Sequence, residues 1–249
     1  MFLRKVSLLR HKVPSFEQFP FSIPVIRALE ELDFNTCVTF FVGENGSGKS
    51  TLLEAIASNC GFHLSGGAKN NQYSMHEQKP ILDKYIRLSW MPKVSNGFFL
   101  RAESFYNFAT YLDILQKENP DQDVFRAYGG KSLHEQSHGE AFLSLFSHRF
   151  DEKALYLLDE PEAALSPARQ LALLKIIHDL SKKGNAQFII ATHSPILLGY
   201  PEGVILNFDS SALEEISYEM TDHYQITHYF LQNRERMLHH LLTEEDETK

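Results

Sequence analysis

The sequence predicts an α/β fold built on a buried, mostly parallel sheet. Three short runs of β-branched, aromatic and other apolar residues, at 38–42, 154–158 and 187–192, are continuous instead of alternating. Such runs are typical of strands that are buried on both faces of a parallel sheet. A helical pattern follows the first run at 51–57 and the second at 167–180. Strands that alternate with helices in this way favour an α/β architecture.

Composition and charge indicate a folded globular chain and bear on whether it binds nucleic acid. The chain has 249 residues, of which 43% are hydrophobic, enough to bury a sizeable core. We expect a single domain, 1–249, with a core lobe over about 1–61 and 151–242 and a helical or insertion lobe over about 62–150. The net charge of −8 argues against a surface dominated by nucleic-acid binding, which needs clustered Lys and Arg. A local basic patch at 3–12 leaves nucleic-acid binding open.

The sequence predicts neither a membrane helix nor a signal peptide. Its longest apolar runs fall well short of the roughly 20 residues that a spanning helix needs. Residues 1–6 alternate and do not form the apolar core of a signal peptide. The cysteines, Cys37 and Cys60, fit buried free thiols of a reducing compartment. We therefore expect no membrane segment and a cytoplasmic location.

The predicted strand at 38–42 leads into a glycine-rich loop and then a helix. The loop fits the pattern G-x-x-x-x-G-K-[ST], followed by a threonine, and it comprises Gly43, Glu44, Asn45, Gly46, Ser47, Gly48, Lys49, Ser50 and Thr51. Glycines let the backbone turn its N–H groups toward phosphates, and the helix N-terminus adds partial positive charge. We expect Lys49 between the β- and γ-phosphates, Ser50 on Mg²⁺ and Thr51 against the α-phosphate. The loop therefore predicts binding of ATP with Mg²⁺.

The second buried run ends in acidic residues. Asp159 follows the run directly, and we expect it to hold Mg²⁺ together with Ser50. Glu160, one residue on, is placed to polarise the attacking water as a catalytic base. Glu162 fits a surface or helix-start acid better than a catalytic one. Ser166 and Pro167 then predict the start of a helix, whose expected apolar residues are Leu171, Leu174, Ile177 and Leu180.

The third buried run ends in Thr192 and His193. An imidazole at this position stands at the carboxyl edge of the sheet, where ligands gather in open α/β folds. We therefore interpret His193 as a second catalytic candidate, a sensor of the γ-phosphate.

Ser137, Gly139 and Glu140 come just before a helical pattern at 141–150. A helix N-terminus that carries a serine and a glycine is a second anion-binding surface. It is too far along the chain from the glycine-rich loop to belong simply to the first one.

The four motifs, in this order, resemble those of the ABC ATPase superfamily across most of the chain: the phosphate loop, S-x-G-E before a helix, D-E-P-E-A-A-L-S and T-H-S-P. The chain looks most similar to small soluble bacterial AAA-family ATPases related to SMC-like and RecF-like ATPases, and the stretch 97–105 is similar to one found in them. The resemblance implies a P-loop core with a mixed or parallel sheet, flanking helices and a helical lobe, and it implies ATP hydrolysis. It also implies a head-to-tail homodimer, in which Ser137 and Gly139 of one copy contact the γ-phosphate bound at Lys49 of the other.

Three positions depart from the pattern of that family. The signature segment 136–140 reads Q-S-H-G-E instead of L-S-G-G-Q, and Ser166 stands in place of the D-loop aspartate. No glutamine takes the Q-loop position; Glu103 and Gln72 are the alternatives, and Glu103 is favoured because it follows a strand-like run. These departures bear on hydrolysis and on coupling between two sites more than on ATP binding.

Several functions fit these motifs. The favoured one is a stand-alone ATPase whose ATP-driven dimerisation and hydrolysis act on an unidentified protein partner, in DNA maintenance or antiphage defence. The alternatives are the nucleotide-binding subunit of a membrane transporter and an ATP-gated interaction module with little turnover. A P-loop kinase is the least favoured, because the signature-like segment and the histidine after the third strand do not belong to a kinase. The C-terminal run 224–242 has helical spacing; it either packs in the core or covers a sheet edge or a partner.

Overall fold

The computed structural model describes residues 1–63, 80–102, 105–121, 123–128, 130–135, 138–147 and 153–243. Its centre is a six-stranded sheet in the order β5-β6-β7-β3-β8-β9. The strands, with their bounds, are β5 (Asn96–Arg101), β6 (Ala154–Asp159), β7 (Ala186–Ala191), β3 (Val38–Val42), β8 (Val204–Asn207) and β9 (Glu214–Ile216). The first five strands are parallel to one another, and β9 is antiparallel to β8. The predicted mixed α/β sheet is confirmed.

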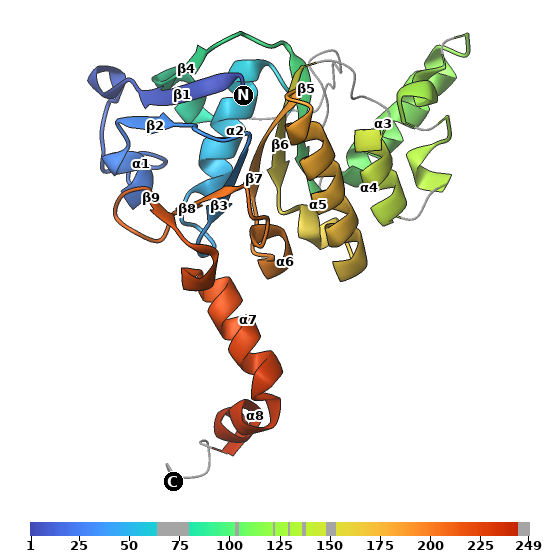
Figure 1. Ribbon diagram of the computed structural model, residues 1–249. Helices are drawn as coiled ribbons and strands as arrows, with labels where there is room; N and C mark the ends of the chain where they lie inside the picture. The colour runs from blue at the N-terminus through green and yellow to red at the C-terminus, as the bar shows by residue number, and fades with distance from the viewer. Residues whose placement is uncertain are drawn as a thin grey trace.

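A smaller antiparallel sheet stands beside the central one (Figure 1). It has the order β2-β1-β4, formed by β1 (Leu3–Leu8), β2 (Glu31–Asp33) and β4 (Ile86–Trp90). The predicted lobe boundary at 62 placed β4 and β5 in the helical lobe, whereas both are sheet strands. Strand β4 pairs with β1 near the N-terminus and β5 pairs with β6 in the second half of the chain, so the sheet core takes in part of that range.

Helices cover both faces of the central sheet (Figure 1). The helices of the body, with their bounds, are α1 (Pro24–Ala28), α2 (Lys49–Cys60), α3 (Phe105–Glu118), α4 (His138–Ser147), α5 (Pro167–Lys182) and α6 (Pro195–Leu198). The described residues also form short 3-10 turns, at Arg10–Lys12, Ile81–Tyr85, Val124–Tyr128, Leu133–Glu135, Pro161–Ala164 and Tyr218–Met220. Among the described residues, no helix is both long enough and apolar enough to cross a bilayer.

The central strands are buried on both faces, as their continuous apolar sequences predict. Along β6, Tyr156 and Leu158 join one hydrophobic cluster with residues of α3, α4 and α5, while Leu155 and Leu157 join another with residues of α2 and the antiparallel sheet. Successive side chains of a strand point to opposite faces, so the sheet separates two cores. This packing fixes the carboxyl ends of β3, β6 and β7 at one edge.

The phase of α5 differs from the sequence-based expectation. Leu173, Ile177 and Leu180 are buried as helical spacing requires, but Leu171 is 59% exposed. Gln170 is buried in its place, and its side-chain amide donates to the backbone oxygen of Leu165 at 3.0 Å. A buried amide is tolerated because its polar atoms are hydrogen-bonded.

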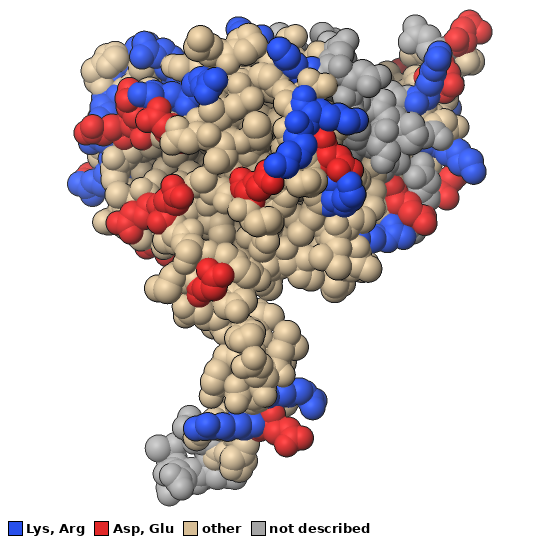
Figure 2. All heavy atoms as spheres, in the orientation of Figure 1, with Lys and Arg blue, Asp and Glu red and all other residues tan. Residues whose placement is uncertain are grey.

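The chain ends in a helical arm, which we define as α7 (Asp222–Gln232) and α8 (Arg234–Thr243). The arm projects away from the body (Figure 1), and neither helix has a buried residue. The core-packing interpretation of 224–242 is therefore wrong. Residues 223–233 include no Lys, Arg, Asp or Glu, and Figure 2 shows this part of the arm as an uncharged stalk below the body.

Candidate functional site

The glycine-rich loop between β3 and α2 has the backbone of an anion cradle. Gly43, Gly46 and Gly48 all have positive φ angles, of 147°, 86° and 104°, a region that L side chains rarely adopt. A Cβ on Gly43 would come within 2.9 Å of Asp209 Oδ1, while one on Gly46 would meet nothing within 4 Å. The loop therefore packs against Asp209 at Gly43, whereas the space around Gly46 is open. Gly48 caps α2, so the helix N-terminus faces into the loop.

Lys49 lies folded over this loop. Its side chain is buried, with the residue only 4% exposed, and Nζ donates to the backbone oxygens of Gly43 at 2.6 Å and Glu44 at 2.9 Å. Burial lowers the pKa of Lys49, and the carboxylate of Glu160 opposes this shift. Phosphate oxygens are stronger hydrogen-bond partners for an ammonium group than carbonyl oxygens are. Lys49 and the loop therefore fit the phosphates of a bound nucleoside triphosphate.

Other residues of the predicted loop complete the cradle. The hydroxyl of Ser47 is buried and, among the described residues, has no hydrogen-bond partner. A buried hydroxyl of this kind fits an approaching phosphate oxygen. The backbone N–H of Glu44 donates to Asp209 Oδ1 at 2.7 Å, so Asp209, just after the end of β8, supports the loop. Asn45 is exposed and Thr51 lies in the first turn of α2, half-buried.

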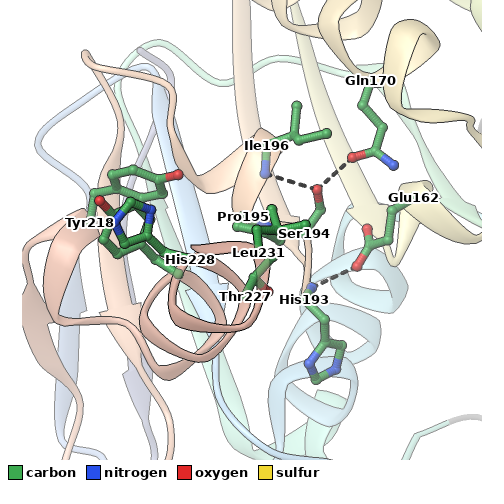
Figure 3. A pocket seen from close by; sticks show the side chains of 11 residues that line it. Glu162, Gln170, His193, Ser194, Pro195, Ile196, Tyr218, Thr227, His228 and Leu231 are labelled. Carbon is green, nitrogen blue, oxygen red and sulfur yellow. Dashed lines mark hydrogen bonds between the residues drawn. The ribbon is translucent and has the colours of Figure 1, made fainter. Parts of the chain in front are cut away.

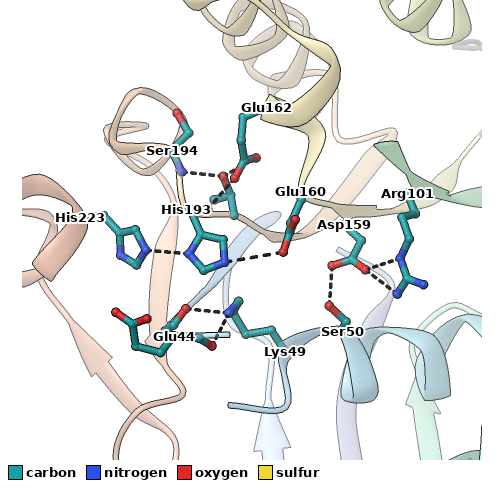
Figure 4. Close-up of polar contacts among 12 residues, drawn as sticks. Glu44, Lys49, Ser50, Arg101, Asp159, Glu160, Glu162, His193, Ser194 and His223 are labelled. Carbon is teal, nitrogen blue, oxygen red and sulfur yellow. Dashed lines mark hydrogen bonds and ion pairs between the residues drawn. The ribbon is translucent and has the colours of Figure 1, made fainter. Parts of the chain in front are cut away.

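The two predicted Mg²⁺ ligands come together at the carboxyl end of β6 (Figure 4). Ser50 Oγ donates to Asp159 Oδ1 at 2.9 Å, although the residues are far apart in sequence. A hydroxyl and a carboxylate are hard oxygen donors of the kind that Mg²⁺ binds, with phosphates and water as its remaining ligands. The described residues hold no cluster of three or more His, Cys, Asp or Glu that could form an all-protein metal cage. The site therefore fits Mg²⁺ that is shared with a nucleotide.

Arg101 is a site residue that the sequence analysis missed. Its Nε and Nη2 donate to Asp159 Oδ2 at 2.8 and 2.7 Å, and Nη2 also bonds to Glu54 of α2. The guanidinium thus occupies one carboxylate oxygen of Asp159 and leaves the other, Oδ1, to Ser50. A small pocket of about 210 Å³ lies here, lined by Ser50, Arg101, Ala102, Asp159, Glu160 and Ala163. The only signal in the sequence is a cation that directly follows the apolar run 98–100.

Glu160 has an unusual backbone that directs its side chain. Its φ of 50° is the only positive one at a non-glycine residue of the described chain, and strained backbone of this kind is concentrated at functional sites. The backbone N–H donates to the oxygen of Ala191 at 2.9 Å, which ties β6 to β7. The carboxylate is 41% exposed and lies 3.6 Å from His193 Nε2. Its exposed carboxylate is accessible to water, as the predicted role of catalytic base requires.

Glu162 lies in the first turn of a short 3-10 helix, in line with the helix-start interpretation, but its carboxylate is directed inward. It accepts hydrogen bonds from Thr192 Oγ1 at 2.8 Å and from the backbone N–H of His193 at 2.6 Å. Burial raises the pKa of Glu162, and these hydrogen bonds oppose the shift. The surface-acid interpretation is therefore wrong. Glu162 instead anchors the loop that presents His193.

His193 faces the nucleotide site from the end of β7. Its Nε2 is directed toward Glu160, and its Nδ1 lies 2.7 Å from Nε2 of His223, in the first turn of α7 (Figure 4). Burial lowers the pKa of His193, and the charges of Lys49 and His223 lower it further. The structure thus brings Lys49, Glu160 and His193 together at one edge of the sheet.

A larger pocket of about 580 Å³ opens beside His193 (Figure 3). Pro195 and Ile196 of α6 line one side of it, and Tyr224, His228 and Leu231 of α7 line another. The three α7 residues are spaced along one face of the helix. The arm therefore begins against the site and then runs away from the body.

The signature segment lies apart from this cluster. Gly139 is in the first turn of α4 and packs against α5, where a Cβ on it would come within 2.2 Å of Arg169 Cδ. Ser137, Glu103 and Gln72 lie outside the described residues. The structure therefore does not bring Gly139 to the phosphate loop of its own chain.

These features together define a P-loop ATPase, and sequence comparison identifies the family. A family model described as "AAA domain, putative AbiEii toxin, Type IV TA system" matches residues 141–199. The xylose/arabinose import ATP-binding protein XylG of Sulfolobus acidocaldarius is 30% identical over 187 residues, which cover 66% of this chain and 69% of that protein. The chain belongs to the ABC-type ATPases of the P-loop superfamily, which hydrolyse ATP and use it with Mg²⁺.

Other matches agree with this family. The hemin import ATP-binding protein HmuV of Nocardia farcinica is 27% identical over 196 residues, which cover 73% of this chain and 67% of that protein. Among solved structures, MJ1267, an ATP-binding cassette of an ABC transporter, superimposes with a TM-score of 0.51 at 16% identity, over 96% of this chain and 99% of that one. At this identity the likeness concerns the fold.

Proposed function

We propose that this chain is an ATP-driven switch that closes as a head-to-tail dimer around two ATP molecules and thereby acts on a partner protein. One observation carries the proposal. Each chain assembles Lys49, the Ser50–Asp159 pair, Glu160 and His193 at one place, but Gly139 of its signature segment packs against Arg169 instead. A signature that must reach a γ-phosphate then has to come from a second copy.

In this proposal each residue has one role. Lys49 binds the β- and γ-phosphates, and Ser50 and Asp159 hold Mg²⁺, which would neutralise phosphate charge there. Glu160 accepts the proton of the attacking water, and His193 donates a hydrogen bond to the γ-phosphate. Arg101 holds Asp159 so that one carboxylate oxygen faces Ser50. Ser137 and Gly139 of the partner copy contact the γ-phosphate from the other side.

The Glu160→Gln variant tests this proposal. The amide is close in shape to the carboxylate but cannot accept the proton, so we expect turnover to fall about 100-fold or more while ATP binding persists. With ATP and Mg²⁺ the variant should elute at twice the monomer mass in size-exclusion chromatography with light scattering. Glu214→Gln, which changes an exposed acid of β9, is the control and should stay active. A Glu160→Gln chain that binds ATP and remains a monomer would rule out the dimer.

The partner class is the least constrained part of the function. We favour a partner in DNA maintenance or antiphage defence, because the matching family model carries the name of a toxin of a toxin–antitoxin system. The second candidate is the nucleotide-binding subunit of a transporter, which the names of the import proteins support. Pull-down with Glu160→Gln and ATP separates them, since a membrane permease among the captured proteins favours the second.

A further inference from the structure

The contact between His193 and His223 is not explained by the family motifs. His193 Nδ1 and His223 Nε2 are 2.7 Å apart, and the two ring centroids are 4.9 Å apart with an angle of 48° between the planes. The other nitrogen of His193, Nε2, is buried and forms no hydrogen bond within the described chain. It faces the Glu160 carboxylate at 3.6 Å. One nitrogen of His193 is therefore held by α7, and the other is directed into the nucleotide site.

A hydrogen bond between two neutral imidazoles can be donated by either ring, because a single proton lies between the two nitrogens. If His193 donates from Nδ1, its Nε2 carries a lone pair that faces the carboxylate of Glu160, and the two repel. If His223 donates from Nε2, the proton of His193 resides on Nε2, where it faces that carboxylate favourably. The second arrangement is the favoured one, and it makes His193 a hydrogen-bond donor toward the site.

His223 is itself held in place by the start of the arm. Thr221 is 1% exposed and caps α7, because its Oγ1 accepts from the N–H of Tyr224 at 3.3 Å and donates to the backbone oxygen of Tyr218 at 2.7 Å. The rings of Tyr218 and Tyr224 pack with their centroids 4.6 Å apart. Tyr218 also packs against the hydrophobic core of the body, so the start of α7 is attached there although no residue of the arm is fully buried.

We propose that His223 is a positioning residue, which donates its Nε2–H to His193 and so keeps the proton of His193 on Nε2 for the γ-phosphate. This inference rests on the proposed role of His193 at the γ-phosphate. It also gives the arm a direct attachment to the nucleotide site, since the same contact joins α7 to His193. The charged groups around His193 are Lys49, Glu44 and Glu160, with His223 as its neighbour from α7.

The test compares two substitutions at position 223. Phe keeps a planar aromatic ring but cannot donate a hydrogen bond, whereas the amide of Gln can donate in place of the imidazole. For His223→Phe we expect the ratio of ATP to ADP affinity to fall about tenfold, because a hydrogen bond to the charged γ-phosphate is lost, with ADP affinity unchanged. His223→Gln should restore most of the ratio. His239→Ala, on the exposed α8, is the control and should not change it.

A second readout does not depend on nucleotide binding. Long-range ¹⁵N–¹H NMR reports which nitrogen of His193 is protonated in the nucleotide-free protein, and His193→Ala assigns the signals. We expect the proton on Nε2 in the natural sequence and a mixture of tautomers in folded His223→Phe. A proton on Nδ1, or the same tautomer and the same affinity ratio in both proteins, would overturn the proposal. If His193→Ala leaves the affinity ratio unchanged, the sensor role fails, and the NMR result still decides the positioning role.

Discussion

The carboxyl edge of the central sheet, where the phosphate loop lies, and the helical arm differ in whether their apolar residues are buried. Both regions are rich in apolar residues, but every residue of β6 is buried, whereas no residue of α7 or α8 is. At the sheet edge, buried polar groups such as Asp159 and Thr192 have hydrogen-bond partners. In the arm, Ile226 and Leu231 are 60% and 73% exposed. Apolar spacing therefore identifies a helix, while only tertiary packing decides whether the helix stabilises the fold.

The largest expected difference between the regions concerns stability. Leu157 is fully buried in β6 and Leu231 is 73% exposed on α7. We expect Leu157→Ala to lower the free energy of unfolding by about 2–5 kcal/mol, because it leaves a cavity in a packed core. Leu231→Ala should change it by no more than about 0.5 kcal/mol. Urea denaturation of both variants measures this, and equal losses would show that the arm is packed in solution.

Removing a basic side chain should change ATP affinity in the phosphate loop but not in the arm. Lys49→Ala removes the buried ammonium of the phosphate loop, and hydrogen bonds to charged groups contribute about 1.5–3 kcal/mol each. We expect ATP affinity to fall roughly 100-fold. Arg236→Ala on the exposed α8 is the matched variant and should leave affinity unchanged in calorimetric titration.

The smallest effect concerns pH. Burial raises the pKa of Glu162 above 4.5, so its protonated form is favoured by folding. The stability that this form contributes is fully present below pH 4.5 and is lost as the pH rises through the raised pKa. Glu162→Gln has no such loss, so the natural protein should become less stable relative to the variant as the pH rises toward neutrality. Denaturation at several pH values measures this difference. The matched variant Glu235→Gln, on exposed α8, isolates the effect of burial, and parallel pH curves for the two variants would contradict it.

Local sequence predicts the parts of the site that lie in one continuous motif. The buried runs correspond to β3, β6 and β7. Ser50, in the helix that follows β3, meets Asp159 at the end of β6, as the parallel arrangement predicts. These contacts are predictable because the carboxyl ends of parallel strands share one edge. The phase of α5 was not predictable, since the choice between Leu171 and Gln170 depends on which neighbour each one meets.

Residues that act through tertiary contacts were missed. Arg101 reaches Asp159 from β5, Asp209 braces the phosphate loop from the end of β8, and His223 reaches His193 from α7. None of them belongs to a motif with fixed spacing, because each lies on a different element from the residue that it supports. The sheet order and the start of the arm bring these pairs together, and neither can be read from one segment of sequence.

The proposed head-to-tail dimer is tested most directly by mixing two variants that we expect to be inactive alone. Lys49→Ala disables the phosphate loop and Ser137→Ala the signature segment. In a symmetric dimer each site combines the loop of one copy with the signature of the other. A mixed dimer then contains one intact site, made from the loop of the Ser137→Ala chain and the signature of the Lys49→Ala chain. We predict that phosphate release, nearly absent in each variant alone, reappears on mixing. A mixture as inactive as its components, under conditions where mixed dimers form, would contradict the shared site.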